Sequence, residues 1–192
     1  MKIKAGGVSK YSTGYLDGDS NPKAGTNSTF IVEPRDINGN RIKDKEVIDE
    51  IINDYTVLLY DIYGNLITGG LTPEYNEPKG YIEYKIINKK VETKIVKVYY
   101  KNEEIILNNN VINVEYGPLD FDNTKLIYNG EMYPLDDNLT ISLASLPIID
   151  LQLYDNFNNE VSIKDFKNIE FKLIVGGNVL SDFIVYNDII RL

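Results

Sequence analysis

The residues of this chain that could do chemistry are its carboxylates, because histidine and cysteine are both absent. That absence excludes imidazole bases, thiolate nucleophiles, histidine-dependent triads, and ordinary zinc, haem or iron–sulfur ligation. Two adjacent pairs, Glu103-Glu104 and Asp136-Asp137, could act as general acid and base, as in glycosidases. Adjacent acids on short connecting loops are usually solvated turns. We therefore predict that the chain is not an enzyme and that it uses no cofactor.

The segment from Asp17 to Asn21 (DGDSN) begins like a calcium-binding loop, with oxygen-bearing side chains at alternate positions. An EF-hand loop requires glycine at its sixth position and glutamate at its twelfth, and here these are Pro22 and Ser28. The EF-hand pattern therefore fails. A looser calcium site on Asp17, Asp19 and Asn21 is the alternative to a simple polar turn.

Three segments share one pattern, in which an apolar strand is followed by Asp, two residues, Gly or Asn, then Asn, one residue and an apolar residue. They run over 30–42 (FIVEPRDINGNRI), 55–67 (YTVLLYDIYGNLI) and 149–161 (IDLQLYDNFNNEV). The Asp, Gly/Asn and Asn positions are Asp36, Gly39 and Asn40; Asp61, Gly64 and Asn65; and Asp155, Asn158 and Asn159. An Asp carboxylate accepts backbone N–H groups across a bend, and Gly or Asn tolerates a positive φ. We predict three structural turns, with ligand-binding loops as the alternative, and expect the closing Ile42, Ile67 and Val161 to re-enter the core.

Charge and hydropathy limit the partners of the chain. With 20 Lys+Arg against 29 Asp+Glu, its net charge of −9 opposes binding to nucleic acid. The most basic stretch, Lys85 to Lys101, alternates with apolar residues, which predicts a solvated strand face. No apolar run approaches the length of a membrane helix, and no hydrophobic segment follows the basic start of the chain. We therefore expect neither nucleic acid nor a membrane as partner.

Strand-like alternation dominates the chain of 192 residues, and short apolar runs end at Asn, Asp, Gly and Pro. Only residues 46–52 could form a helix, and they could equally form a strand. The Gly117-Pro118 step ends one strand series, which predicts two domains at 1–117 and 118–192. Each half carries enough strands for an immunoglobulin-type sandwich, so the expected fold class is all-β. The first 25 or so residues read as a loop-like arm.

The strand-Asp-x-x-Gly-Asn pattern resembles strand ends of bacterial and phage immunoglobulin-like domains and is similar to filamin-type repeats. In the first half the resemblance spans about Ala24 to Tyr116, including the segment from Ala24 to Phe30 (AGTNSTF). The second half resembles short β-sandwiches of phage virion proteins through residues 155–159 (DNFNN) and 168–173 (NIEFKL). The resemblance implies structural or binding roles.

These observations predict a non-catalytic protein that docks on a larger assembly. The specific hypothesis is a decoration or fibre-associated protein of a tailed-phage capsid, located on the virion surface, with a homo-oligomer as one arrangement. The alternatives are a rod segment of a filamin-like scaffold or bacterial adhesin, located in the cytoplasm or outside the cell, and a carbohydrate-binding module. The last is suggested by 15 tyrosines, whose rings stack on sugars but also suit half-buried strand positions.

Overall fold

The chain is described by a computed structural model over residues 7, 11–135 and 149–162 and over strands 173–175, 178–180, 184–186 and 189–191. It divides into two compact units, Met1–Glu115 and Tyr116–Leu192. The sequence-based boundary after residue 117 lies close to this division. The Asp136-Asp137 pair lies outside the described residues.

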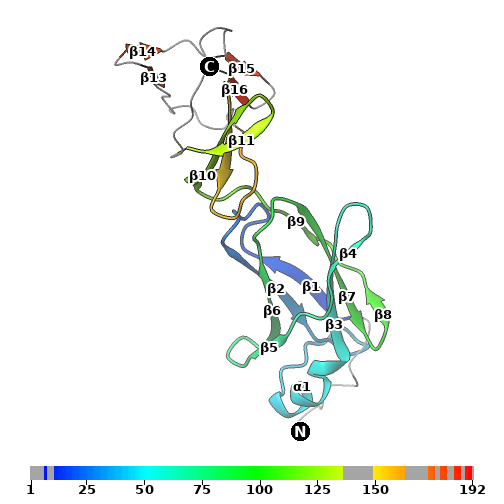
Figure 1. Cartoon of the computed structure of the whole chain (residues 1–192). Coiled ribbons are helices and arrows are strands. Elements are labelled where there is room, and N and C mark those ends of the chain that lie inside the picture. The colour runs from blue at the N-terminus through cyan, green and yellow to red at the C-terminus, as the bar shows by residue number, and fades with distance from the viewer. Residues whose placement is uncertain are drawn as a thin grey trace. The chain divides into compact units, whose positions relative to one another are not determined.

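Two antiparallel sheets face each other in the first unit (Figure 1). The first sheet has the order β1-β2-β6-β5, with β1 at Thr13–Asp17, β2 at Asn27–Glu33, β6 at Tyr81–Ile87 and β5 at Pro73–Asn76. The second has the order β4-β3-β7-β8, with β4 at Leu66–Thr68, β3 at Tyr55–Tyr60, β7 at Thr93–Tyr100 and β8 at Glu103–Ile105. Strand β9 (Val111–Asn113) also pairs with β7. This order is that of an immunoglobulin-type sandwich, with A-B-E-D in one sheet and C′-C-F-G in the other.

Alternating side chains from both sheets fill the space between them. The first sheet contributes Phe30, Val32, Ile82, Tyr84 and Ile86, and the second contributes Val57, Leu59, Val96 and Val98. All nine are at most 2% exposed. Because burying one such side chain contributes about 1.5–3 kcal/mol, this layer is the main source of stability of the unit. The predicted all-β class is confirmed.

The expectation of a loop-like arm is wrong for residues 13–17, which form β1 and pair with β2 from Thr13↔Glu33 to Asp17↔Thr29. The segment contains Gly14, which weakens a strand pattern in the sequence. In the fold, however, a Cβ at Gly14 would lie 2.8 Å from the Phe30 ring and 2.9 Å from the Leu107 side chain. Glycine is therefore used here for close packing, a role that it takes where another group approaches a strand. Ala24, also in the expected arm, is 2% exposed within the core.

Residues 46–52, for which helix and strand were both expected as alternatives, lie mostly in a short helix. Helix α1 spans Lys45–Ile51 and continues into a 3₁₀ turn, η1, at Ile52–Asp54. The Asp44 side chain accepts from the backbone N–H of Glu46, and this N-cap fixes where the helix begins. No helix in the described part of the chain is long and apolar enough to span a membrane.

Antiparallel strands also form the second unit. Its main sheet has the order β11-β10-β12-β16-β15, with β11 at Glu131–Pro134, β10 at Leu119–Tyr128, β12 at Ile149–Asp155, β16 at Ile189–Arg191 and β15 at Ile184–Tyr186. A separate hairpin pairs β13 (Leu173–Val175) with β14 (Asn178–Leu180). Leu151, Leu153 and Val161 form its described core cluster. That this unit is itself a two-sheet immunoglobulin-like sandwich stays a prediction.

Candidate functional site

The three repeated segments each form the same Asp-centred turn. In the first, Asp36 Oδ1 accepts from the backbone N–H groups of Asn38 (2.9 Å) and Asn40 (2.8 Å), and Oδ2 accepts from Asn40 Nδ2 (3.1 Å). The Asp36 N–H donates to the Asn40 carbonyl at 2.9 Å, and Gly39 has a φ of +80°. Glycine adopts this left-handed conformation at no steric cost. The carboxylate is thereby committed to the turn itself.

The second and third turns repeat this geometry. Asp61 Oδ1 accepts from Tyr63 N and Asn65 N, both at 2.8 Å. Asp155 Oδ1 accepts from Phe157 N at 2.8 Å and from Asn159 N at 2.9 Å. The positive φ is at Gly64 (+84°) in one turn and at Asn158 (+63°) in the other. Asp155 Oδ2 also accepts from the Gly117 N–H at 2.8 Å. The third turn therefore also fixes the start of its own unit.

Hydrogen bonds hold two of these carboxylates in the charged form. The side chain of Asn65 and its backbone N–H lower the pKa of Asp61 below its ordinary value. At Asp155, burial acts to raise the pKa, but the hydrogen bonds from Asn159, Gly117 and Phe157 together outweigh it and lower the pKa.

The residues that close the three repeats differ in burial. Ile42 (1% exposed) and Val161 (3% exposed) enter the cores of their units. The expectation that Ile67 does the same is wrong, because its side chain is 37% exposed. Ile67 lies in β4, which is the last strand of its sheet, so within the described ranges one side of the strand has no sheet neighbour. The same local turn therefore leads to a buried residue outside the named strands at Ile42 and Val161, and to an exposed residue of an edge strand at Ile67.

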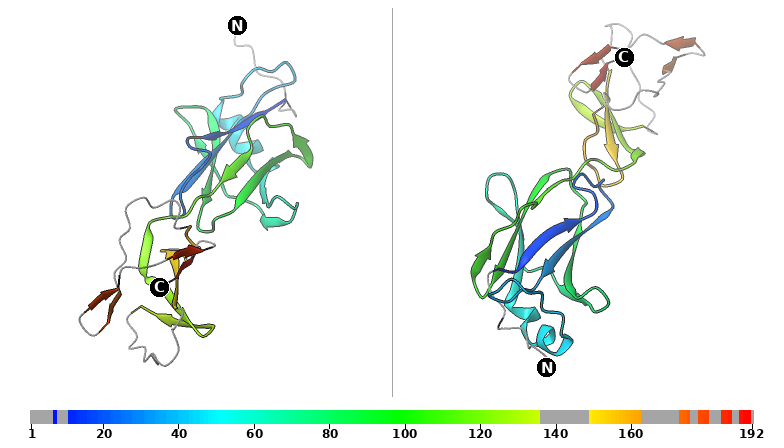
Figure 2. Two further views of the ribbon diagram at one scale, coloured as in Figure 1. Left: turned by 90° about the horizontal axis from the view of Figure 1, so that it is seen from above. Right: turned by 180° about the vertical axis from the view of Figure 1, so that it is seen from behind.

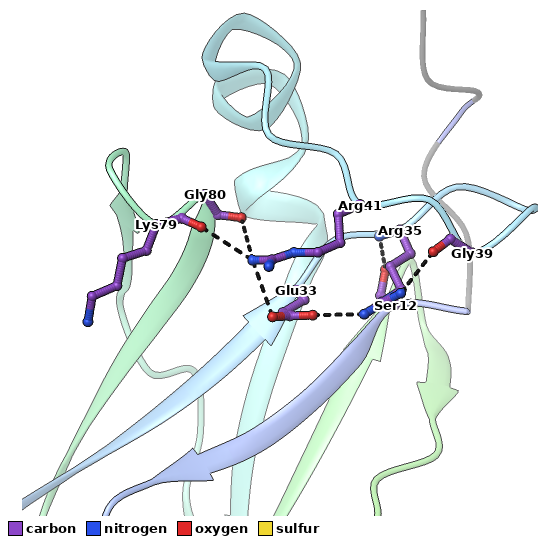
Figure 3. A network of polar contacts seen from close by, with 7 residues as sticks. All are labelled: Ser12, Glu33, Arg35, Gly39, Arg41, Lys79 and Gly80. Carbon is purple, nitrogen blue, oxygen red and sulfur yellow. Dashed lines mark hydrogen bonds and ion pairs between the residues drawn. The ribbon is translucent and has the colours of Figure 1, made fainter.

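An ion-pair network around Glu33 anchors the first turn (Figure 3). Glu33 Oε2 lies 2.9 Å from Arg35 Nη2, and its Oε1 lies 3.2 Å from Arg41 Nη2. Arg35 Nη1 donates to the Gly39 carbonyl at 2.9 Å, and Arg41 Nη2 donates to the Gly80 carbonyl at 3.4 Å. These contacts join the end of β2 to the Asp36 turn and to the turn between β5 and β6. Because each charged group contacts groups of the fold, the network has a structural role.

The loose calcium candidate is held by local hydrogen bonds. Asp19 Oδ1 accepts from the Asn21 N–H at 2.8 Å, and Asn21 Oδ1 accepts from Asn113 Nδ2 at 3.3 Å. Asp17 ends β1. In the residues that the structure describes, no three acidic side chains cluster closely enough to hold a metal ion. A site on Asp17, Asp19 and Asn21 stays a prediction.

The adjacent acids Glu103-Glu104 and the adjacent tyrosines Tyr99-Tyr100 lie on the second sheet. Glu104 Oε1 is 3.5 Å from Lys97 Nζ, and Glu103 is paired with Tyr100 at the start of β8. Tyr100 points inward, and its ring centroid lies 4.9 Å from that of Tyr55. Tyr99 is the next residue along the strand and therefore faces the other way.

A basic groove lies beside β4 and β6 and has a volume of about 390 Å³. Its apolar wall is formed by Leu59, Ile67, Leu71 and Ile87; its lysines are Lys85, Lys89, Lys90 and Lys94; and Thr68 and Glu92 complete the lining. The solvated strand face expected from Lys85 to Lys101 is wrong at Lys94, which is 3% exposed. The other three lysines are exposed.

Lys94 is buried with its ammonium group hydrogen-bonded. Its Nζ donates to the Ile87 carbonyl at 3.0 Å and to Asn88 Oδ1 at 3.1 Å, and Glu92 Oε1 lies 3.9 Å away. Asn88, which is fully buried, in turn donates from Nδ2 to Ser28 Oγ at 2.8 Å. Burial lowers the pKa of Lys94, and Glu92 opposes that shift.

Sequence reasoning missed this lysine, although a signal was present. Along β7 the buried positions are Lys94, Val96, Val98 and Tyr100. Lys94 therefore has the same inward parity as the apolar residues that follow it. Counting by twos from Val98 identifies it as an inward-facing lysine.

Comparisons with known proteins are limited to likenesses of fold. No protein-family model and no curated protein matches the chain. Among solved structures, the Escherichia coli adhesin FdeC is similar at 15% identity with a TM-score of 0.45, over 79% of this chain and 43% of that one. The Yersinia pseudotuberculosis adhesin InvE is similar at 16% identity with a TM-score of 0.45, over 79% of this chain and 36% of that one. The filamin domain of Lin-41 is similar at 12% identity with a TM-score of 0.41, over 59% of this chain and 100% of that one.

The chain thus spans less than half the length of the two adhesin chains that it matches. Identities this low do not place it in a family. The immunoglobulin-type assignment of the first unit is carried by its own strand order and facing sheets.

Proposed function

We propose that this chain is a non-catalytic structural protein that docks on a larger assembly through the first unit. The observation that carries the proposal is an apolar hairpin tip between β3 and β4. Within six residues it exposes Ile62 (59%), Tyr63 (83%), Leu66 (55%) and Ile67 (37%). Single exposed apolar residues are ordinary, but a contiguous group marks an interaction surface.

The turn chemistry makes this tip a rigid surface. The Asp61 carboxylate binds the N–H groups of Tyr63 and Asn65, so the backbone that carries Ile62 and Tyr63 is held in one conformation. The hairpin projects from the side of the first unit in two views (Figures 1 and 2). A preorganised apolar tip loses little conformational entropy on binding, which favours docking on a protein partner.

The assembly that we favour is a tailed-phage particle, with the chain as a decoration or fibre-associated protein on the virion surface. The support for this choice is the resemblance of both halves to phage immunoglobulin-like and virion sandwich domains. A rod segment of a filamin-like scaffold or adhesin is the second candidate, and the tandem order of two compact units favours it.

Co-sedimentation tests the docking proposal. The full chain is mixed with purified phage particles from the source of the sequence, and with the corresponding cell envelopes, and the pelleted fraction is measured. We expect saturable sedimentation with the particles, lost in the triple variant Ile62→Ser/Tyr63→Ser/Leu66→Ser.

The matched control is Ile37→Ser/Ile106→Ser/Met132→Ser, which removes three exposed apolar side chains from other places (69%, 90% and 61% exposed). Equal loss of sedimentation in both variants would refute the role of the hairpin. Sedimentation with envelopes but not with particles would favour the adhesin candidate, and sedimentation with neither would refute docking.

A further inference from the structure

Two open strand edges border the basic groove. Strand β6 pairs with β2 as far as Ile87, but it pairs with β5 only from Tyr81 to Tyr84. In the described part of the chain, residues 85–87 therefore have no strand on the β5 side. Strand β4 is the last strand of the opposite sheet. Unpaired edges present backbone N–H and C=O groups that can accept a further strand.

The side chains of the groove combine apolar contact with positive charge. Ile67 on β4 and Ile87 on β6 line it while 37% and 63% exposed, respectively. Lys85, Lys89 and Lys90 are exposed around these isoleucines. Two acids partly balance them, because Glu74 Oε2 lies 2.9 Å from Lys85 Nζ and Glu92 Oε2 lies 3.9 Å from Lys90 Nζ. This local excess of lysine lies in a chain whose net charge is −9.

We infer that the basic groove binds an extended acidic segment of a partner protein, in which acidic and apolar side chains alternate along each face of the segment. The inference rests on the proposed docking function and names the chemistry of the partner. Lys85 and Ile87 share one face of β6, so an added strand can place a carboxylate against Lys85 and, two positions away, an apolar side chain against Ile87. A second copy of this chain fits less well, because two copies of charge −9 repel each other at long range.

Lys94 preorganises one wall of this site. Its ammonium group holds the Ile87 carbonyl and the Asn88 side chain, and the Asn88 carbonyl accepts from Gly25 N at 2.6 Å. The end of β6 is thereby fixed without a β5 partner. A strand edge that is already ordered binds a peptide at lower entropic cost than a mobile one.

Peptide titration tests this inference with the full chain. The probe is a capped eight-residue peptide in which pairs of Glu alternate with pairs of Val, so that each face carries Glu and Val in turn. It is compared with the same peptide carrying Lys in place of Glu, and binding is followed by amide chemical shifts in NMR. We expect shifts confined to residues 66–68 and 85–92. We also expect affinity for the acidic peptide about tenfold or more above that for the basic one. The affinity should fall as salt rises from about 50 to about 500 mM.

A charge-matched pair of variants locates the binding site. Lys85→Glu/Lys89→Glu/Lys90→Glu should weaken binding of the acidic peptide about tenfold or more. Lys43→Glu/Lys79→Glu/Lys101→Glu makes the same change of net charge at exposed lysines outside the groove, and it should change affinity less than about threefold. Circular dichroism checks that both variants fold.

Several outcomes would overturn the inference: no binding, shifts outside the groove, equal loss in both variants, equal binding of the basic peptide, or tighter binding of a short single-stranded RNA at the same residues. The docking proposal fails separately. A chain that binds the acidic peptide through the groove but sediments with no assembly would uphold the groove and refute docking. A chain that sediments through its hairpin but binds no acidic peptide would do the reverse.

Discussion

The repeated Asp turn allows a prediction with a control built into the same unit. Asp36 and Asp61 accept the same set of hydrogen bonds, two from backbone N–H groups and one from an Asn side chain. Asp36 is only 2% exposed, whereas Asp61 lies in the exposed hairpin. Replacement of either Asp by Ala removes these three bonds, and the difference between the two losses of stability tests whether burial strengthens them.

The expected cost of Asp36→Ala follows from its three hydrogen bonds. At a net value of about 1 kcal/mol each, and because water replaces a buried acceptor poorly, the free energy of unfolding should fall by about 3 kcal/mol. With a urea dependence of about 1.5 kcal/mol per molar, the midpoint of the first unit should fall by about 2 M. Asp61→Ala should shift the midpoint much less, because water can replace the lost acceptor.

Urea denaturation followed by far-UV circular dichroism measures both midpoints. Hydrogen exchange of the β3 and β7 amides reports the first unit separately from the second. Asp36→Asn, which keeps an acceptor oxygen but loses the charge, should lie between the wild type and Asp36→Ala. If Asp61→Ala cost as much stability as Asp36→Ala, the argument from burial would be wrong.

Three further predictions concern buried polar groups of the first unit. Lys94→Ala should lower the free energy of unfolding by about 2–3 kcal/mol in urea titrations, because the Ile87 carbonyl and the Asn88 side chain lose their donor. The control Lys90→Ala, at an exposed position, should change the free energy of unfolding by less than about 0.5 kcal/mol. Equal effects of the two substitutions would contradict this prediction. Tyr84→Phe should raise stability by about 1 kcal/mol, because the buried Tyr84 hydroxyl has no hydrogen-bond partner among the residues that the structure describes; a thermal midpoint below that of the wild type would refute it. Burial raises the pKa of both Tyr84 and Tyr55 above the ordinary 10.0, so the stability linked to their neutral phenols is fully present below pH 10 and is lost as the pH rises above it. Thermal scans from pH 8 to pH 11 should show this loss of stability, and the loss should be smaller in Tyr84→Phe. An unchanged dependence of the thermal midpoint on pH in that variant would count against the assignment.

Some of the architecture follows from local sequence. The hydrogen bonds that the three Asp turns share join residues at most four positions apart, so the Asp and Asn side chains and the positive-φ residue carry this common arrangement. Strand β7 also follows from local pattern, because Val96 and Val98 alternate with less buried neighbours on a pleated strand.

Other elements depend on pairing with distant residues. Strands β1 and β5 are weak in sequence, with Gly14 in one and Pro73 in the other, and each is stabilised by its partner strand in the sheet. The short β4 makes Ile67 an edge residue even though its turn is like that of Ile42. Local chemistry does not distinguish these two cases, because burial depends on which strand lies alongside.

The amino-acid sequence by itself determined the absence of histidine and cysteine chemistry. It also determined the strands whose apolar residues alternate and the turns at Asp36, Asp61 and Asp155, because these depend on residue type and short spacing. Only the tertiary structure decided that Lys94 is buried and that Lys89 and Lys90, which are close to it in sequence, line one groove together with Ile67. The physical reason is that burial and groove formation need two sheets to face each other, and contacts between strands distant in sequence set that arrangement.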